Sequence, residues 1–221
     1  MPSVPPLYAH DPFLLVQHAL TRPWLDLPMA ALTIACEGWA LVLLAAAFVG
    51  WRERRLPESV RVLAPLYLGL ALSSVVVQTL KTLLATPRPL AVLGPVVHVQ
   101  LEALYQNGFP SGHSASAAAV AVFLLSRYRA RAWPLAALAL LGGISRVYVG
   151  AHWVTDVLGG WTIGAIAALV ATPLLEAARR RVRALRGGDS ASGGGARAES
   201  LGEPQVVGLD PKPEAVDRQR P

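Results

Sequence analysis

The chain has 221 residues, of which 53% are hydrophobic and 15% are charged, and its mean hydropathy is +0.43. Soluble domains carry about 25% charged residues, so this composition argues against a soluble domain and indicates a membrane protein. The formal net charge of +6 rests on 18 arginines against 2 lysines. These arginines flank apolar runs, which favours a role in membrane topology over nucleic-acid binding.

The first residues are expected to lie outside the membrane core. Residues 1–9 are rich in proline and predict irregular backbone. Residues 11–22 are too short to span a bilayer, and their apolar spacing predicts a short helix that lies in the membrane interface. No charged stretch precedes an apolar run, so no cleavable signal peptide is expected. Cys36 is the only cysteine, which excludes an intramolecular disulfide and a cysteine-based metal site.

Five apolar segments follow as candidate membrane spans. A spanning helix needs about 20 apolar residues. The third and fourth segments are shorter, which is tolerated where their outer ends are buried in protein around a site. We therefore predict an all-α polytopic membrane helix bundle, preceded by the interfacial helix. The predicted spans are residues 29–51, 62–85, 113–127, 133–149 and 153–176.

Three clusters of arginine predict the orientation of this bundle. With five spans, all three clusters fall on one side of the membrane, and the positive-inside rule makes that side cytoplasmic. The loop 86–112 and the turn 150–152 are then expected outside. The clusters lie within residues 52–61, 127–131 and 179–186.

The composition changes again at Gly187. From there to Pro221 the apolar content is too low to offset the entropy cost of ordering, so a disordered cytoplasmic tail is expected. The predicted organisation is an N-terminal segment (1–28), a membrane-embedded domain (29–177) and a basic juxtamembrane segment with the tail (178–221).

Lys81 and Arg88 lie at the outer end of the second predicted span. They are seven residues apart, about two helical turns, so both can face the same side. Pro87 and Pro89 are expected to break the helix near Arg88. On these residues alone a second interpretation stays open, in which both cations snorkel and anchor a helix end.

The segment Pro110-Ser111-Gly112-His113 opens the third span. Ser111 suits an N-cap, and the backbone amides after it point outward at the positive end of the helix dipole. Such a helix start can bind an anion, and Gly112 lets the anion approach the backbone closely. His113 in the first turn could protonate a leaving oxygen. The alternative is an ordinary helix start.

The stretch SRVYVGAHWVTD, residues 145–156, places four polar groups between two apolar segments. His152 and Asp156 are four residues apart, so on a helix they share a face and can hydrogen-bond. A carboxylate behind an imidazole fixes its tautomer, and Arg146 offers a planar fork of donors to a phosphate. The alternative is an ion pair that caps two helices near the membrane surface.

Together the three stretches offer three cations, a nest of backbone amides and two histidines. Phosphoryl transfer needs such parts: positive charge around the equatorial oxygens, an in-line nucleophile and a proton donor. No cluster of Asp, Glu and His has metal-ligand spacing, and the cations can supply the charge that a metal would supply.

The motifs K-x6-RP, PSGH and SR-x5-H-x3-D, in this order, resemble the three signature motifs of the type-2 phosphatidic acid phosphatase superfamily. The resemblance covers residues 10–177, although many members have six spans rather than five and an interfacial helix. It implies a metal-independent phosphatase without a cofactor. In it, His152 forms a phosphohistidine, Asp156 orients His152, and His113 protonates the leaving group. The resemblance implies that the phosphate is held by Lys81, Arg88, Arg146, Ser111 and Gly112.

Glu37 and Ser145 are further candidates for the site. Glu37 lies inside the first predicted span, where a lone carboxylate is costly, so it should pair with a cation such as Lys81 or stay protonated. The residues expected to face water on the outer side are His10, His18, His98, Glu102, Gln106 and Asn107. The expected interfacial anchors are Trp24, Trp51, Trp133 and Trp153.

The predicted function is hydrolysis of a phosphate or diphosphate on a lipid at the outer leaflet. Small size, arginine-rich inner loops and an outward site resemble bacterial undecaprenyl-diphosphate phosphatases, which implies a bacterial plasma-membrane protein with the substrate lipid and the bilayer as partners. No nucleic acid and no obligate protein partner are expected. Hydrolysis of phosphatidic acid or phosphatidylglycerophosphate is the alternative. The five spans disfavour a soluble haloperoxidase-like protein, and the intact His113 and His152 disfavour a lipid-binding or transport protein with a relict site.

Overall fold

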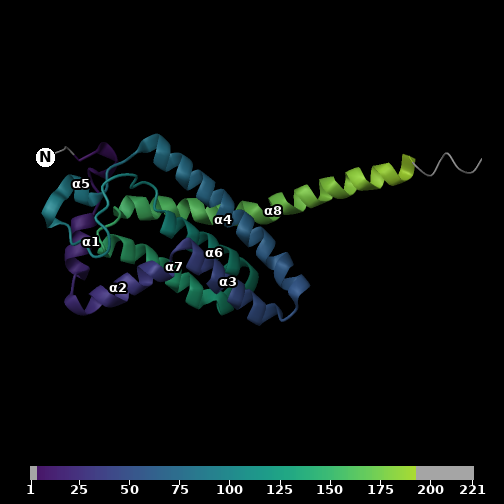
Figure 1. The fold of residues 1–221 in the computed structure, drawn as a ribbon, viewed down its shortest axis with the longest axis horizontal. Helices are drawn as coiled ribbons and strands as arrows, with labels where there is room; N and C mark the ends of the chain where they lie inside the picture. Colours follow the sequence, from purple (N-terminus) through teal and green to yellow (C-terminus); the bar gives the residue numbers. More distant parts are fainter. Residues whose placement is uncertain (1–3, 193–221) are drawn as a thin grey trace, which may run out of the picture. The chain divides into compact units, whose positions relative to one another are not determined.

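The computed structural model describes residues 4–192, and in this range the regular structure is helical, without a strand. This confirms the predicted all-α class. Residues up to Arg179 form one compact unit (Figure 1). The longer helices are α1 (Phe13–Leu20), α2 (Pro23–Ala35), α3 (Gly38–Glu53), α4 (Leu56–Leu84), α6 (Gly112–Tyr128), α7 (Trp133–Tyr148) and α8 (Val154–Ser192). The short ones are η1 (Pro6–Tyr8), α5 (Pro89–Leu93), η2 (Gly94–Val96) and η3 (Arg129–Ala132).

Helix α6 packs against α3, α4 and α7. Its first half, GHSASAAA, carries small side chains in succession, so small residues face every neighbour and the helices approach closely. The core beside it includes Val49 of α3, Leu66 of α4 and Leu124 of α6, each 1% exposed or less. This packing fixes the position of the start of α6, which carries the second motif.

Helix α8 approaches α6 through two glycines. A Cβ atom on Gly160 would collide with the carbonyl oxygen of Ser111, and one on Gly164 with that of Ala115. Only glycine lets the two backbones come this close. The approach brings the beginnings of α6 and α8 together, where the amide of Ser111 donates to the carbonyl oxygen of Asp156 at 3.0 Å.

Two helical stretches of the described chain are long and apolar enough to cross a membrane, Leu56–Val96 and Val154–Arg183. The pair Pro23–Ala35 and Gly38–Glu53 makes a third candidate if the two halves form one bent span. Helices α6 and α7, with 17 and 16 residues, fall below that length. The count of five spans therefore stays a prediction.

The prediction of an unbroken span over residues 29–51 is wrong. The chain bends by 74° between α2 and α3, and Glu37 at the bend has extended backbone angles. Glycine is a weak helix former, and here Gly38 follows a carboxylate that an apolar helix interior would not accommodate. The break turns Glu37 towards a polar cavity instead.

Helix α1 lies within the predicted segment 11–22, and its position in the membrane interface stays a prediction. Its Gln17 is fully buried, and the Gln17 amide donates to the carbonyl oxygens of His98 and Tyr148 at 2.9 and 3.1 Å. His98, expected to face water, lies 3.3 Å from the carboxylate of Asp26 and is only partly exposed. The N-terminal helices therefore hold the loop that contains His98 and the end of α7 against the bundle.

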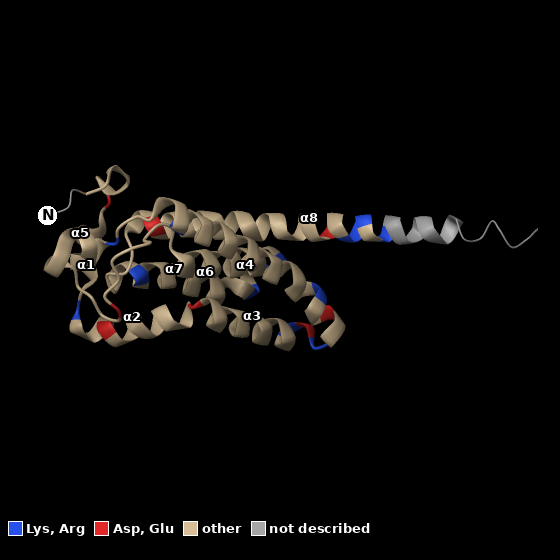
Figure 2. Ribbon diagram, turned by 45° about the horizontal axis from the view of Figure 1, so that its top comes forward, with Lys and Arg blue, Asp and Glu red and all other residues tan. Residues whose placement is uncertain are grey.

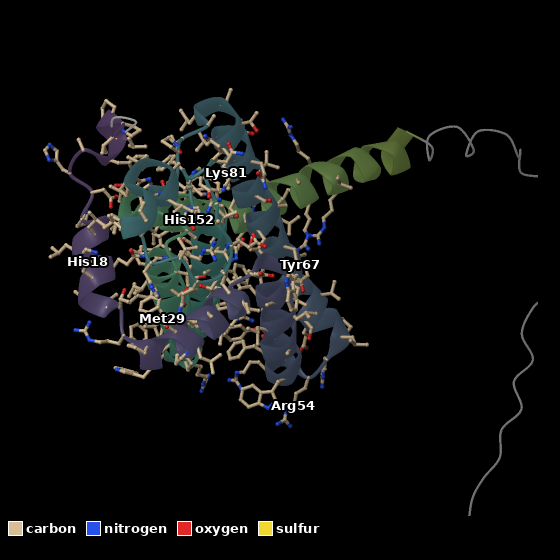
Figure 3. The ribbon with its side chains drawn as sticks, turned by 60° about the vertical axis from the view of Figure 1, so that its left-hand side comes forward. His18, Met29, Arg54, Tyr67, Lys81 and His152 are labelled. Atoms are coloured by element: carbon tan, nitrogen blue, oxygen red, sulfur yellow. The ribbon has the colours of Figure 1, made fainter. Side chains whose placement is uncertain are left out.

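The loops that carry the first two arginine clusters meet at one end of the bundle. Glu53 accepts a hydrogen bond from the hydroxyl of Tyr128 at 2.7 Å and lies 3.7 Å from the guanidinium of Arg127. Figure 2 shows charged residues gathered where α3 leads into α4, and Figure 3 shows Arg54 and Lys81 at opposite ends of the bundle. The first two motifs and the arginine loops are thus separated by the length of α4.

Helix α8 continues through Gly187 to Ser192. The predicted start of the disordered tail at Gly187 is therefore too early. The rest of that prediction, residues 193–221, lies outside the described residues.

Candidate active site

A cavity of about 610 Å³ lies where α4 and α7 end and α6 begins. All three motifs contribute to its wall, although they are far apart in the sequence. Figure 3 shows Lys81 and His152 near the same end of the bundle. The predicted site residues that line the cavity are Lys81, Arg88, Gly112, His113, Arg146 and His152.

His152 lies in the turn between α7 and α8 and is 2% exposed. The carbonyl oxygen of Arg146 accepts from the amides of Ala151 and His152 at 3.1 and 3.2 Å, which closes the turn. The Nδ1 atom of His152 lies 3.2 Å from Oδ2 of Asp156. A carboxylate at Nδ1 holds the ring proton there, so the lone pair is on Nε2. The Nε2 atom lies 3.4 Å from Nη1 of Arg88.

The surroundings of His152 keep its imidazole neutral. Burial lowers the pKa of His152 well below its usual value, and the positive charges of Arg88, Arg146 and Lys81 lower this pKa further. Neutral imidazole is the nucleophilic form. His152 is therefore ready to attack without first losing a proton at neutral pH.

Three backbone carbonyls hold the guanidinium of Arg88. Its Nε, Nη1 and Nη2 atoms donate to the carbonyl oxygens of Gln106, Ala151 and Asn107 at 2.8, 2.8 and 3.3 Å. The ammonium of Lys81 donates to the same Asn107 oxygen at 2.9 Å. The loop that contains Gln106 and Asn107 thus positions the charged groups of both Lys81 and Arg88. Sequence reasoning missed this, because a backbone carbonyl carries no residue identity.

Three cations, Lys81, Arg88 and Arg146, share the cavity wall with two carboxylates, Glu37 and Glu102. Within the described part of the chain, Lys81, Arg88 and Arg146 form no ion pair with a carboxylate. Arg88 and Arg146 are only 8% and 6% exposed, and no described residue is a hydrogen-bond partner of Arg146 Nε. Burying charge without a partner is costly. The cavity is therefore suited to a ligand with several negative charges.

Ser111 is the N-cap of α6, as predicted. Its Oγ atom accepts from the amide of Ser114 at 3.4 Å and from the Ser114 hydroxyl at 2.9 Å. Ser111 is fully buried and is not part of the cavity wall, unlike Gly112 and His113. Nε2 of His113 is buried without a hydrogen-bond partner, so an oxygen of a bound ligand can become its partner.

The structure separates the two further candidates. Glu37 lines the cavity, but its carboxylate accepts from the indole N–H of Trp39 and not from Lys81, so the expected pairing is wrong. Ser145 is fully buried, and its hydroxyl oxygen lies 2.8 Å from that of Thr33. Ser145 therefore joins α7 to α2 and does not reach the cavity.

Sequence reasoning also missed Tyr8, in the segment expected to be irregular. Tyr8 is 2% exposed, its hydroxyl donates to Oδ1 of Asp156 at 2.9 Å, and its ring stacks on Trp153 with centroids 4.7 Å apart. Trp153 is 3% exposed, so its prediction as an interfacial anchor is wrong. A partner 148 residues away leaves no spacing signal in the sequence. The other predicted anchors, Trp24, Trp51 and Trp133, are 72%, 69% and 65% exposed.

Residues 62–180, more than half of the chain, match the PAP2 superfamily. The chain belongs to the PAP2 superfamily. The matched range contains all three motifs and every residue of the cavity named above except Glu37. It does not contain Tyr8.

Three relatives of this PAP2 chain carry names for lipid phosphatases. Undecaprenyl-diphosphatase BcrC of Bacillus subtilis (strain 168) is 34% identical over 134 residues, which is 60% of this chain and 65% of that protein. An undecaprenyl-diphosphatase of Sulfolobus acidocaldarius is 32% identical over 100 residues, covering 45% and 48%. Phosphatidylglycerophosphatase B of Bacillus subtilis is 49% identical over 67 residues, covering 25% and 33%. The chain thus spans less than two thirds of the length of each.

Two solved structures share the fold. LpxE of Aquifex aeolicus superposes with a TM-score of 0.64 and 29% identity, over 73% of this chain and 92% of that chain. The first transmembrane PAP2-type phosphatidylglycerolphosphate phosphatase from Bacillus subtilis gives a TM-score of 0.55 and 26% identity, over 74% and 84%. With its apolar helices, this PAP2 chain is an integral membrane protein.

Proposed function

We propose that this PAP2 protein is a lipid phosphatase that forms a phosphohistidine on His152. One observation carries the proposal: a neutral imidazole, backed by the carboxylate of Asp156, faces a cavity with three cations that form no ion pair with a carboxylate among residues 4–192. A phosphate group supplies the negative charge that these cations lack, and it presents phosphorus to the nucleophile.

In the first step, Nε2 of His152 attacks phosphorus in line with the bond to the leaving oxygen, and that P–O bond breaks. His113 gives a proton to the departing oxygen. Asp156 accepts from Nδ1–H and stabilises the positive charge that develops on the phosphorylated ring. Water then loses a proton to His113 and attacks phosphorus, the P–N bond breaks, and phosphate leaves.

The phosphate oxygens are held from several elements in this proposal. Lys81, Arg88 and Arg146 neutralise them, and the amides beside Gly112 donate at the positive end of α6. Ser111 acts by capping α6, because its Oγ accepts from Ser114 and Ser111 does not line the cavity. The charge neutralisation comes from side chains and backbone, so the reaction is expected to be independent of metal ions and cofactors.

The best-supported substrate is undecaprenyl diphosphate, converted to undecaprenyl phosphate. The support is the similarity to two undecaprenyl-diphosphatases. Phosphatidic acid or phosphatidylglycerophosphate is the alternative, and the similarity to phosphatidylglycerophosphatase B favours the latter. The motifs contact phosphate and not the lipid tail, so these substrates share one mechanism.

The protein is proposed to lie in a bacterial plasma membrane, with its site at the outer face and its C-terminal tail in the cytoplasm. The arginine loops at the end of the bundle away from Lys81 support this orientation. The proposed partners are the lipid substrate and the bilayer, without nucleic acid or an obligate protein partner.

Substitution of His152 by Ala tests the nucleophile. Purified His152→Ala protein should insert, fold and yet lose turnover of all three lipid substrates in EDTA, because no other group can take up the phosphoryl group. Wild-type protein mixed with labelled substrate should give an acid-labile phosphoenzyme that His152→Ala lacks. Asp156→Asn should lose less, since the nucleophile remains and only its orientation suffers.

Three results would contradict parts of this proposal. Near-normal turnover by His152→Ala would remove His152 as nucleophile. Binding of lipid phosphates by the wild-type protein without any phosphate release would favour the non-enzymatic alternative, a lipid-binding or transport protein. Activity that disappears in EDTA and returns with a divalent cation would replace the metal-independent mechanism.

A further inference from the structure

Two residues before α1, Tyr8 and Asp11, bind the first turn of α8, and both lie outside the residues that match the PAP2 superfamily. Tyr8 donates to the carboxylate of Asp156. Three residues later, Asp11 accepts from the amides of Val154 and Thr155 at 3.2 and 2.7 Å, at the first turn of α8. The N-terminal segment thus supplies side chains to the helix start that carries Asp156.

The two oxygens of Asp156 have different partners. Oδ2 accepts from the amide of Trp153 at 3.1 Å and lies 3.2 Å from Nδ1 of His152. Oδ1 accepts from the Tyr8 hydroxyl, the partner that the described structure provides for this atom. Asp156 is fully buried, so water does not replace a lost donor at Oδ1 without rearrangement. Tyr8 therefore completes the hydrogen bonding of the carboxylate that holds His152.

The ring of Tyr8 is held independently of its hydroxyl. It stacks on Trp153 at an interplanar angle of 14°, and Phe13 meets the same indole edge-on at 5.5 Å. The indole N–H of Trp153 donates to the carbonyl oxygen of Pro87 at 3.0 Å, next to Arg88. Removal of the hydroxyl alone should leave this stack in place.

We propose that Tyr8 is a positioning residue for the phosphohistidine chemistry, acting through Asp156. This inference rests on the proposed function of His152. By donating to Oδ1, Tyr8 keeps the carboxylate plane turned so that Oδ2 faces Nδ1 of His152. It also weakens the basicity of the carboxylate, which keeps the bridging proton on His152 and leaves the Nε2 lone pair for attack.

The hydroxyl of Tyr8 is a donor throughout the working pH range. Burial raises the pKa of Tyr8, and the negative charge of Asp156 raises it further. The Tyr8 hydroxyl therefore keeps its proton at a pH where an ordinary tyrosine begins to lose it, and Tyr8 acts as a donor instead of a second titrating group near neutral pH.

The test is Tyr8→Phe in the full-length protein, assayed with one soluble and one lipid phosphate. We expect kcat to fall about tenfold or more with little change in KM, because phosphate binding by the cations is unaffected. The acid limb of the rate profile should move to higher pH, since a carboxylate with one donor fewer takes up a proton more readily. In an Asp156→Asn background, Tyr8→Phe should cause almost no further loss, as expected for residues that act as one unit.

Tyr148→Phe is the matched control. Tyr148 is also fully buried, and its hydroxyl donates to Asp26 at 2.6 Å, away from His152. This variant should lose thermal stability to a similar degree and keep the wild-type pH profile. Replacement of Tyr8 by 3-fluorotyrosine is a second probe that keeps ring and hydroxyl. Fluorine makes the hydroxyl a stronger donor, so the acid limb should move to lower pH, and no movement would count against the proposal.

The outcomes separate this inference from the proposed function. If His152→Ala is inactive while Tyr8→Phe lowers only the unfolding temperature, Tyr8 is structural and the inference is wrong. If the losses from Tyr8→Phe and Asp156→Asn multiply, Tyr8 does not act through Asp156. If His152→Ala keeps its activity, the proposed nucleophile itself fails, whatever Tyr8→Phe does.

Discussion

His113 and His152 have the same side chain, but their imidazole rings have different neighbours. His152 has a carboxylate at Nδ1 and the guanidinium of Arg88 near Nε2, and its lowered pKa means that it stays neutral until the pH falls well below the usual histidine value. Within the part of the chain that the structure describes, His113 has no carboxylate partner, and its Nε2 lies at the cavity without a hydrogen bond. The first arrangement suits a nucleophile, and the second suits a group that bonds to an oxygen of the substrate.

The acid role of His113 predicts a loss that depends on the leaving group. With an alkoxide leaving group, His113→Ala should slow phosphoenzyme formation by about a hundredfold or more, the usual scale of general acid catalysis. With a nitrophenolate or a terminal phosphate as leaving group, the loss should shrink, because these oxygens depart without a proton. Rapid-quench measurement of the phosphoenzyme on both substrate types checks this. Equal losses would show that His113 binds phosphate and is not the acid.

At the scale of the elements, the site depends on how closely α8 approaches α6. The glycines Gly160 and Gly164 are four residues apart on one face of α8, and both lie against carbonyl oxygens of the α6 start. This contact places Asp156 beside the start of α6, so that the third motif lies next to the second. The small residues of α6 likewise let α3, α4 and α7 approach its other faces closely.

Substitution of Gly164 by Ala should therefore damage the site from a distance. The added methyl group meets the backbone of Ala115, which cannot move aside as a flexible side chain would, and such overpacking costs about 1–3 kcal/mol. Thermal unfolding in detergent should show a lower midpoint, together with reduced turnover. Gly50→Ala is the control, since nothing lies within 4 Å of its Cβ position. That helical substitution should leave turnover unchanged and raise stability slightly, by about 0.5–1 kcal/mol. Equal behaviour of the two variants would contradict the close-approach argument.

At the scale of the whole molecule, the cavity and the arginine loops lie at opposite ends of the bundle, so the membrane orientation of the loops determines that of the cavity. Glu53 ties the loop after α3 to the end of α6 through Tyr128 and Arg127. The cavity lies at the other ends of α4 and α6. If the arginine loops are cytoplasmic, the cavity opens towards the outer leaflet, which is the proposed location of the substrate.

Cysteine labelling tests this orientation in a Cys36→Ala background. Gln106 and Ala130 are both exposed and lie in the loop beside the cavity and the arginine loop, respectively. In intact cells, an impermeant thiol reagent should label Gln106→Cys and leave Ala130→Cys unlabelled until the cells are lysed. The reverse pattern would place the site in the cytoplasmic leaflet and overturn the orientation.

The sequence by itself determined the helical membrane class and the motif residues that line the cavity. The membrane class follows from composition, which does not depend on how the chain folds. The contact between His152 and Asp156 and the capping of α6 by Ser111 follow from local helix geometry. The order and completeness of the three motifs identified the remaining candidate site residues, because the motifs matched a family pattern. These features required no knowledge of how the helices pack.

Only the tertiary structure decided which groups complete and support the site. The hydroxyl of Tyr8 at Asp156 and the loop carbonyls at Lys81 and Arg88 join segments far apart in the chain. Such contacts depend on how the helices pack and where the backbone bends, as at the 74° break before α3. Spacing along a chain reports neighbours within a few helical turns, so it carries no signal for partners that packing alone brings together.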